Sequence, residues 1–350
     1  MNKTYKKLNI KRYLIYTVIF AIISFFTLYY IYKIYENPAS LFIFTTFSRK
    51  WIISLLILLG LYYLLDGLRL HYILKVLNIK VRFGYIFKLV FINIFISSVT
   101  PFASGGGIAQ VYFLNKKGVS PGKATAATTI RTFMPLSFVF IGTPLIFLGK
   151  ENIAARFTGI PVFSYLFIFI FLYSALFYII IFKNRIIKSM VYRFLRFIYN
   201  KNLISHNKYY NSVKFLLKNI NLFGENLALF VRGNLLQIFL SIFFTLLFLL
   251  AEFTFSILIL KGMGYQVDYL TVIFMQVIII FLMYFAPTPG ASGVAEGGYS
   301  LLFSRLVSQN EIFPLIFAWR FFTKYIGIGI GIILFIILLL QGDNDYEKQT

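Results

Sequence analysis

The amino-acid sequence predicts an all-α integral membrane protein with about six full spans and two re-entrant broken hairpins arranged as an inverted repeat. Hydrophobic residues make up 59% of the 350 residues, charged residues only 13%, and the mean hydropathy is +0.81. A soluble protein of this size needs far more polar surface. Several windows, among them 13–32, 238–260 and 326–340, approach the roughly 20 apolar residues that cross a bilayer.

Basic residues set the expected orientation, because cytoplasmic loops are enriched in lysine and arginine. Five basic residues precede Tyr13, so the N-terminus is placed in the cytoplasm and the following run is interpreted as a span rather than a signal peptide. The six spans are expected at residues 13–32, 51–77, 121–148, 161–182, 229–260 and 312–340. The regions are expected to be an N-terminal helix and outer loop (1–50), a first repeat (51–182) with a hairpin at 86–118, a cytoplasmic amphipathic segment (183–225), a second repeat (226–341) with a hairpin at 269–306, and a tail (342–350).

The amphipathic segment holds nine basic residues and no acidic one between Lys183 and Lys218. Its apolar residues between Ile186 and Ile198 share one helical face, and its basic residues share the other. This pattern is typical of a helix that lies on anionic lipid. We interpret it as a membrane-surface anchor, and a specific headgroup site is the alternative.

Several classes of function are disfavoured. The net charge of +23 lies mainly in short loops between apolar runs, which favours a role in orientation over nucleic-acid binding. The chain has no cysteine, and it contains no P-loop, metal-binding histidine motif or nucleophile elbow. We therefore expect no catalytic residue, no metal and no cofactor.

The two hairpins share one sequence pattern. Thr100–Gly105 reads TPFASG and Thr288–Gly293 reads TPGASG. An arginine follows the proline of each motif by 30 or 31 positions, as Arg131 and Arg320. An acidic residue precedes the same proline by 35 or 37 positions, as Asp66 and Glu252. The loop charges place the first hairpin inside and the second outside, so the halves are predicted to be inverted, a plan that recurs in secondary transporters.

The motifs suggest an anion site at the hairpin tips. Irregular backbone at membrane depth has to be buried in protein or line a wet cavity, and free N–H groups at a helix start attract anions. Arg131 and Arg320 are expected to bind phosphate, or else to be neutralised by Asp66, Glu252 or Glu296. The candidate substrate-binding residues are Pro101, Ser104, Gly105, Gly106, Gln110, Arg131, Pro289, Gly290, Ser292, Gly293, Glu296 and Arg320, and the candidate charge-balancing residues are Asp66, Glu252 and Lys324. The run Gly327–Gly331 has the small-xxx-small spacing of a helix-packing face.

These motifs resemble the lysylphosphatidylglycerol synthase transmembrane region family, also called flippase-like. The resemblance rests on Thr100–Arg131, on the run from Pro287 to Glu296, and on Arg320. It implies movement of aminoacylated phosphatidylglycerol between leaflets, and with it resistance to antimicrobial peptides. The family's soluble transferase domain does not fit within 350 residues, so we expect translocation without synthesis.

The expected function is therefore translocation of an anionic or aminoacylated phospholipid or a glycolipid across a bacterial cell membrane. The rival is a membrane subunit of a separate lipid-modifying enzyme, and a third possibility is an ion-coupled carrier of a soluble anion. The expected partners are membrane phospholipid and either a second copy of the chain or that enzyme, with no nucleic acid. An Arg320→Ala chain is expected to fold normally and to stop headgroup transfer.

Overall fold

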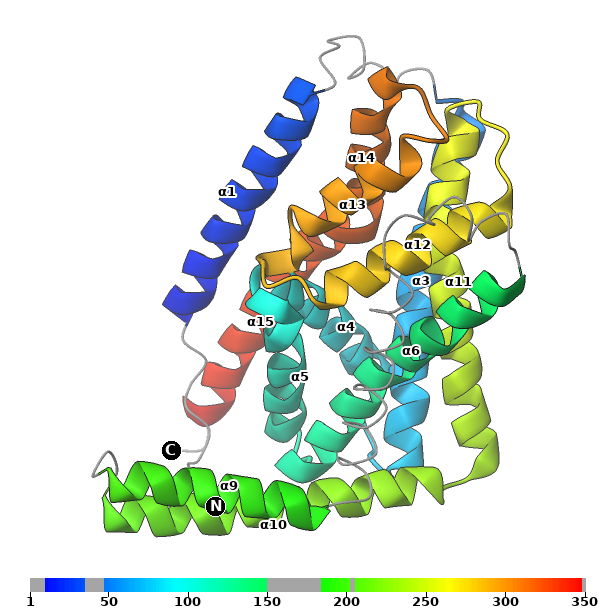
Figure 1. The fold of residues 1–350 in the computed structure, drawn as a ribbon. Coiled ribbons are helices and arrows are strands. Elements are labelled where there is room, and N and C mark those ends of the chain that lie inside the picture. The colour runs from blue at the N-terminus through cyan, green and yellow to red at the C-terminus, as the bar shows by residue number, and fades with distance from the viewer. Residues whose placement is uncertain (1–9, 35–46, 150–183, 202–204, 348–350) are drawn as a thin grey trace.

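Figure 1 shows the computed structural model, which describes all residues except 1–9, 35–46, 150–183, 202–204 and 348–350. All regular elements in the described residues are helical. The elements are α1 (Ile10–Ile34), α3 (Arg49–Val76), α4 (Phe83–Val99), η2 (Pro101–Ala103), α5 (Ser104–Lys116), α6 (Pro121–Gly149), α9 (Asn184–Asn200), α10 (His206–Val231), α11 (Leu235–Gly262), α12 (Tyr269–Tyr284), η3 (Pro289–Ala291), α13 (Val294–Phe303), η4 (Gln309–Glu311), α14 (Ile312–Arg320), η5 (Phe321–Tyr325) and α15 (Ile326–Glu347).

Three helical stretches in the described residues are long and apolar enough to cross a membrane. They are Arg49–Val76, Leu235–Gly262 and Gln309–Leu339. The all-helical class and these three candidate spans agree with the sequence prediction. Helices α1 and α6 contain 25 and 29 residues, and the span expected at 161–182 lies outside the described residues.

The fifth expected span begins later than the hydropathy pattern suggested. Helix α10 ends at Val231, and α11 starts after Asn234, whose side chain accepts a hydrogen bond from the Gln237 amide at 3.3 Å. An asparagine in this position is a favourable N-cap, so it fixes the start of the helix. Helices α9 and α10 contact each other and lie across the lower end of the molecule in Figure 1, below α3 and α11.

Helices α3 and α11 form the most extensive pair in the core. The Tyr62 ring of α3 stacks on Phe248 of α11 with 4.7 Å between centroids and meets the Phe255 ring edge-on at 5.7 Å. Offset and edge-on contacts of this kind stabilise aromatic pairs beyond their buried area. The two helices that carry Asp66 and Glu252 are therefore held side by side.

The glycine run in α15 packs against α4, as its spacing predicted. A Cβ at Gly331 would overlap the Phe91 carbonyl and lie 2.6 Å from Phe95 Cβ. A Cβ at Gly327 would lie 3.0 Å from the Ile94 side chain, whereas one at Gly329 would meet nothing. Glycine at the first and last positions thus permits close approach of the two helices.

Each hairpin is interrupted at a proline. Helix α4 ends before Pro101, which begins η2, and α12 ends before Pro289, which begins η3. The residue after each proline is left-handed, with φ of 53° at Phe102 and 60° at Gly290. The turns η2 and η3 contact each other, and Figure 1 places them near the middle of the molecule. The two predicted breaks are therefore both present and lie against one another.

Close packing within the first hairpin depends on two of the predicted glycines. A Cβ at Gly105 would lie 2.6 Å from the Thr100 methyl group, and one at Gly106 would overlap the Ser97 hydroxyl and lie 2.6 Å from Asn93 Nδ2. Only glycine has room at these positions. Gly105 and Gly106 bring α5 directly onto α4.

A candidate binding cavity at the hairpin tips

A cavity of about 240 Å³ lies beside the two tips. Residues of α3, α4, α5, α6, α11 and α12 line it, together with the turns η2 and η3 and the π-helical segment η5. The two halves of the chain thus meet around one space. Its polar and charged lining residues are Tyr62, Asp66, Arg69, Asn93, Ser97, Ser98, Arg131, Thr132, Glu252, Tyr284 and Lys324.

One buried carboxylate is shared by two arginines at this cavity. Asp66 Oδ1 accepts from Arg69 Nε at 2.6 Å, and Asp66 Oδ2 accepts from Arg131 Nη2 at 2.6 Å. Arg131 Nη1 donates to Gln110 Oε1 at 3.3 Å, and the Arg69 guanidinium lies 4.1 Å from the centre of the Phe248 ring. All three charged side chains are at most 7% exposed. Arg131 is therefore neutralised in part by Asp66, as one of the two expectations held.

Positive charge remains after this pairing. Arg69 Nη1 and Arg131 Nε are buried and have no hydrogen-bond acceptor among the residues that the structure describes. Farther around the cavity, Glu252 and Lys324 are each the strongest charged neighbour of the other. The described lining residues therefore include three cations and two carboxylates. An isolated buried charge is costly, so this excess favours an anionic guest.

The second arginine is arranged differently. Arg320 Nε donates to Glu296 Oε1 at 2.7 Å, and Arg320 Nη2 donates to the Gly290 carbonyl at 3.3 Å. The other oxygen of Glu296 accepts from the Gly293 amide at 2.7 Å. Glu296 is 0% exposed and Arg320 only 2%. This is a one-to-one ion pair that holds the second tip, and Arg320 is not among the residues that line the cavity.

The cation that the second half contributes to the cavity is Lys324. It lies in the π-helical turn η5, which directly follows Arg320. A π-helical turn contains an extra residue relative to an α-helical one, so it changes the direction in which the following side chains point. Such turns occur frequently at functional sites.

The structure brings some of the predicted residues to the cavity and places others in its support. Gly290 lines it with Asp66, Arg131, Glu252 and Lys324. Gln110 reaches it only through its hydrogen bond to Arg131. The other predicted substrate-binding residues do not line the cavity; they are Pro101, Ser104, Gly105, Gly106, Pro289, Ser292, Gly293, Glu296 and Arg320.

Two backbone amides expected to attract an anion already have acceptors. The Gly105 amide donates to Thr100 Oγ1 at 2.9 Å, and the Gly293 amide donates to Glu296. The hydroxyl of Ser292 lies 3.0 Å from that of Ser24 on α1, away from the cavity. Side-chain cations are thus the principal source of positive potential here.

Seven of the polar and charged lining residues were not predicted from the sequence, although signals were present for three of them, Arg69, Asn93 and Ser97. Arg69 follows Asp66 by three positions, the spacing at which helical side chains meet. Asn93 and Ser97 are four positions apart in an otherwise apolar stretch of α4, so they share one face of that helix. Polar residues repeated on one face of a short apolar helix indicate a wet surface.

In the described part of the chain, no group of three or more histidine, aspartate and glutamate side chains is placed to hold a metal ion. The chemistry that the cavity offers is electrostatic binding, with hydroxyl and amide groups beside the charges.

Comparisons with known proteins find a membrane-protein family and two membrane-protein relatives. The family model described as the lysylphosphatidylglycerol synthase TM region matches residues 41–331. A UPF0104 membrane protein of Archaeoglobus fulgidus is 26% identical over 279 residues, which are 78% of this chain and 81% of that protein. A UPF0104 membrane protein of Methanocaldococcus jannaschii is 28% identical over 211 residues, covering 56% of this chain and 59% of the relative.

Proposed function

The chain belongs to the lysylphosphatidylglycerol synthase transmembrane region family, and on that premise we propose that it moves the headgroup of an anionic or aminoacylated phospholipid, or of a glycolipid, between membrane leaflets. The family is one of membrane proteins, and the chain has helices able to span a bilayer. The proposed location is the cell membrane, with the N-terminus in the cytoplasm. The comparisons match a membrane region and include no catalytic domain.

The observation that carries the proposal is the excess of positive charge in a cavity formed where the two hairpin tips meet. Two guanidinium groups share the single carboxylate of Asp66. A phosphodiester carries one negative charge and accepts hydrogen bonds from guanidinium groups in a bidentate manner. One such group would balance the three cations and two carboxylates of the lining.

A repeated architecture supports a transport role. The first half consists of the helix with Asp66, the broken hairpin α4–α5 and the helix with Arg131. The second half has the same order: the helix with Glu252, the hairpin α12–α13 and the helix with Arg320. In Figure 1, α5 runs downward from the meeting point of the tips and α13 runs upward. These directions favour the proposed inverted relation, in which each hairpin faces one side of the membrane.

In the proposed mechanism the phosphate occupies the cavity while the acyl chains remain in the bilayer. Arg131 and Arg69 hold the phosphate, and an amine on the headgroup, where present, is placed toward Glu252. Alternate opening of the two hairpins would expose the cavity to one side at a time. Arg320 acts indirectly, because its contact with the Gly290 carbonyl positions the second tip.

Transfer of labelled lipid in reconstituted vesicles tests this function. Vesicles that contain the purified chain and a fluorescent phosphatidylglycerol are treated with an impermeant quencher, and the fraction of label exchanged between leaflets is followed in time. We expect exchange with the natural chain, and a loss of at least about tenfold with Arg131→Gln, the equivalent of about 1.4 kcal/mol of phosphate binding.

The same assay separates the rival functions. Aminoacylated and neutral headgroups are compared with phosphatidylglycerol in parallel vesicles. No lipid exchange with folded protein would favour the membrane subunit of a lipid-modifying enzyme, and equal exchange by the natural chain and Arg131→Gln would reject the cavity as the transport site.

A further inference from the structure

A second polar pocket lies outside the central cavity, at the junction of α3, α4 and α5. It has a volume of about 550 Å³ and is lined by Lys80, Val81, Arg82, Gly84, Tyr85, Lys88 and Lys117. None of these residues lines the central cavity. We propose that this pocket binds a phosphate-bearing group, independently of the lipid transfer proposed above.

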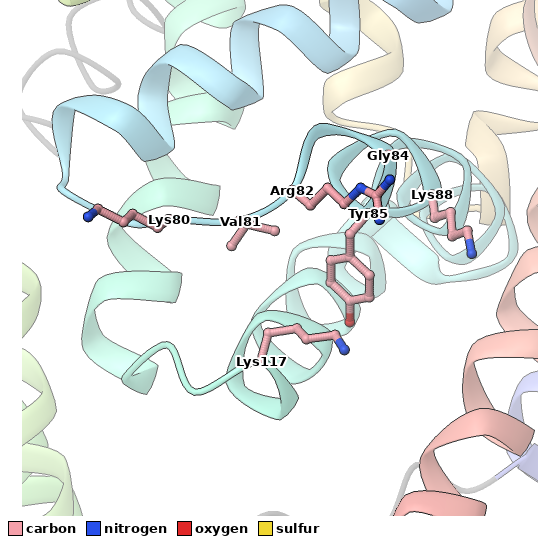
Figure 2. Close-up of a pocket in the computed structure, with 7 residues that line it drawn as sticks. All are labelled: Lys80, Val81, Arg82, Gly84, Tyr85, Lys88 and Lys117. Carbon is pink, nitrogen blue, oxygen red and sulfur yellow. The ribbon is translucent and has the colours of Figure 1, made fainter.

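Three cations surround one aromatic ring in this pocket. Figure 2 shows the Tyr85 ring pointing from α4 toward the ammonium group of Lys117, with Arg82 above it and Lys88 to its right. Lys117 Nζ lies 5.3 Å from the centre of that ring. The ammonium group of Lys80 points away from the others in this view, so Lys80 belongs to the edge of the pocket.

In the described part of the chain, no carboxylate lies within salt-bridge distance of these cations. The buried salt bridges of Asp66 and Glu296 are made with Arg69, Arg131 and Arg320, and none of these residues belongs to this pocket. Among the described residues that line the pocket, none is acidic. Concentrated positive charge with no counter-charge repels itself, so an anion that neutralises it binds favourably.

The pocket is held open by contacts of its own. Tyr85 Oη donates to the Phe113 carbonyl at 2.9 Å and thereby ties the start of α4 to the end of α5. Gly84 lines the pocket, and a Cβ added at Gly84 would meet no atom within 4 Å, so the space beside this residue is open. The first turn of α4 adds the partial positive charge of a helix start to the side-chain cations. A preformed site loses little freedom when it binds its ligand.

Two sources of phosphate fit this position. Helix α3, a candidate membrane span, ends at Val76 shortly before the pocket begins at Lys80. The pocket is therefore placed near the membrane surface, within reach of lipid headgroups and of soluble phosphate compounds. A volume of about 550 Å³ is typical of sites that hold a whole small molecule rather than a lone ion.

Native mass spectrometry of the detergent-solubilised full chain tests the site. The probes are dihexanoyl phosphatidylglycerol, inorganic phosphate and dihexanoylglycerol, which lacks phosphate. The pocket variant combines Arg82→Gln, Lys88→Gln and Lys117→Gln. Each cation near a membrane surface contributes about fivefold to anion binding, so we expect the phosphatidylglycerol binding that persists in a variant with the central cavity blocked, Gly107→Leu, to weaken about 100-fold when the pocket substitutions are added.

A matched control removes three cations elsewhere. Lys188→Gln, Arg193→Gln and Arg196→Gln on α9 make the same change in net charge, and Gly107→Leu alters the central cavity instead. The proposal requires that both controls keep pocket binding within about twofold, a free-energy change of about 0.4 kcal/mol. It is overturned if the α9 variant loses as much binding as the pocket variant, if Gly107→Leu abolishes the binding, or if dihexanoylglycerol binds as well as the phospholipid.

Competition identifies the source of the phosphate. If millimolar inorganic phosphate displaces the lipid from the natural chain but not from the pocket variant, the site recognises the phosphate group itself and admits soluble phosphate compounds. Lipid binding that inorganic phosphate does not displace supports a headgroup site. A failure of lipid transfer in vesicles leaves either result standing, because binding is measured separately.

Discussion

Replacement of the two buried arginines by glutamine should have unequal effects on stability. In Arg320→Gln, Glu296 keeps its burial and the Gly293 amide but loses the only cation within salt-bridge distance in the described residues. Removing one partner of a buried ion pair costs about 3–5 kcal/mol. In Arg131→Gln, Asp66 keeps Arg69 at 2.6 Å, and the loss is one charged hydrogen bond, about 1.5–3 kcal/mol.

The predicted gap of about 2 kcal/mol is a factor of about 30 in the ratio of folded to unfolded protein. Steric trapping in bicelles measures the free energy of unfolding of each variant directly. Arg232→Gln serves as the control because Arg232 is exposed, and it should change the free energy by no more than about 0.5 kcal/mol.

A second prediction in the same assay checks the cause. The double variant Glu296→Gln with Arg320→Gln should be more stable than Arg320→Gln alone, because the uncompensated carboxylate is gone. Equal destabilisation by Arg131→Gln and Arg320→Gln, or the reverse order, would refute the inference that Asp66 retains a second cation whereas Glu296 does not.

Four further substitutions probe the tips. Gly107→Leu should place a side chain in the cavity and stop lipid transfer without loss of stability, whereas Gly297→Leu in the other hairpin should leave transfer intact; the vesicle assay compares them. Gly106→Ala should destabilise the chain by about 1–3 kcal/mol, measured by steric trapping, because the methyl group overlaps Ser97. Ala103→Gly should raise the thermal unfolding temperature slightly, since φ is 51° at Ala103 and a left-handed alanine costs about 1–2 kcal/mol that glycine avoids.

Much of the fold could be predicted because its signals are local. The prolines of the two motifs stop their helices, and the glycine spacing in α15 gives close packing against α4. The relation between Asp66 and Arg131 could be anticipated as one of a few pairings, since a buried guanidinium needs a partner.

The different roles of the two arginines could not be predicted from their matching contexts. Arg320 is followed by a π-helical turn that brings Lys324, rather than Arg320, to the cavity. The sequence contains no separate signal for that turn. Arg320→Ala, expected from the sequence to leave the fold intact, is now predicted to destabilise it, because the partner carboxylate of Glu296 is fully buried.

Photo-crosslinking tests most directly whether the cavity receives a lipid headgroup. Phosphatidylglycerol with a diazirine on its headgroup is activated in vesicles that contain the natural chain, and the modified peptides are mapped by mass spectrometry. We predict adducts on cavity residues such as Tyr62, Asn93 and Tyr284, lost in Gly107→Leu. Adducts confined to outward-facing residues such as Ile57 and Leu246, with the cavity unlabelled, would contradict the account.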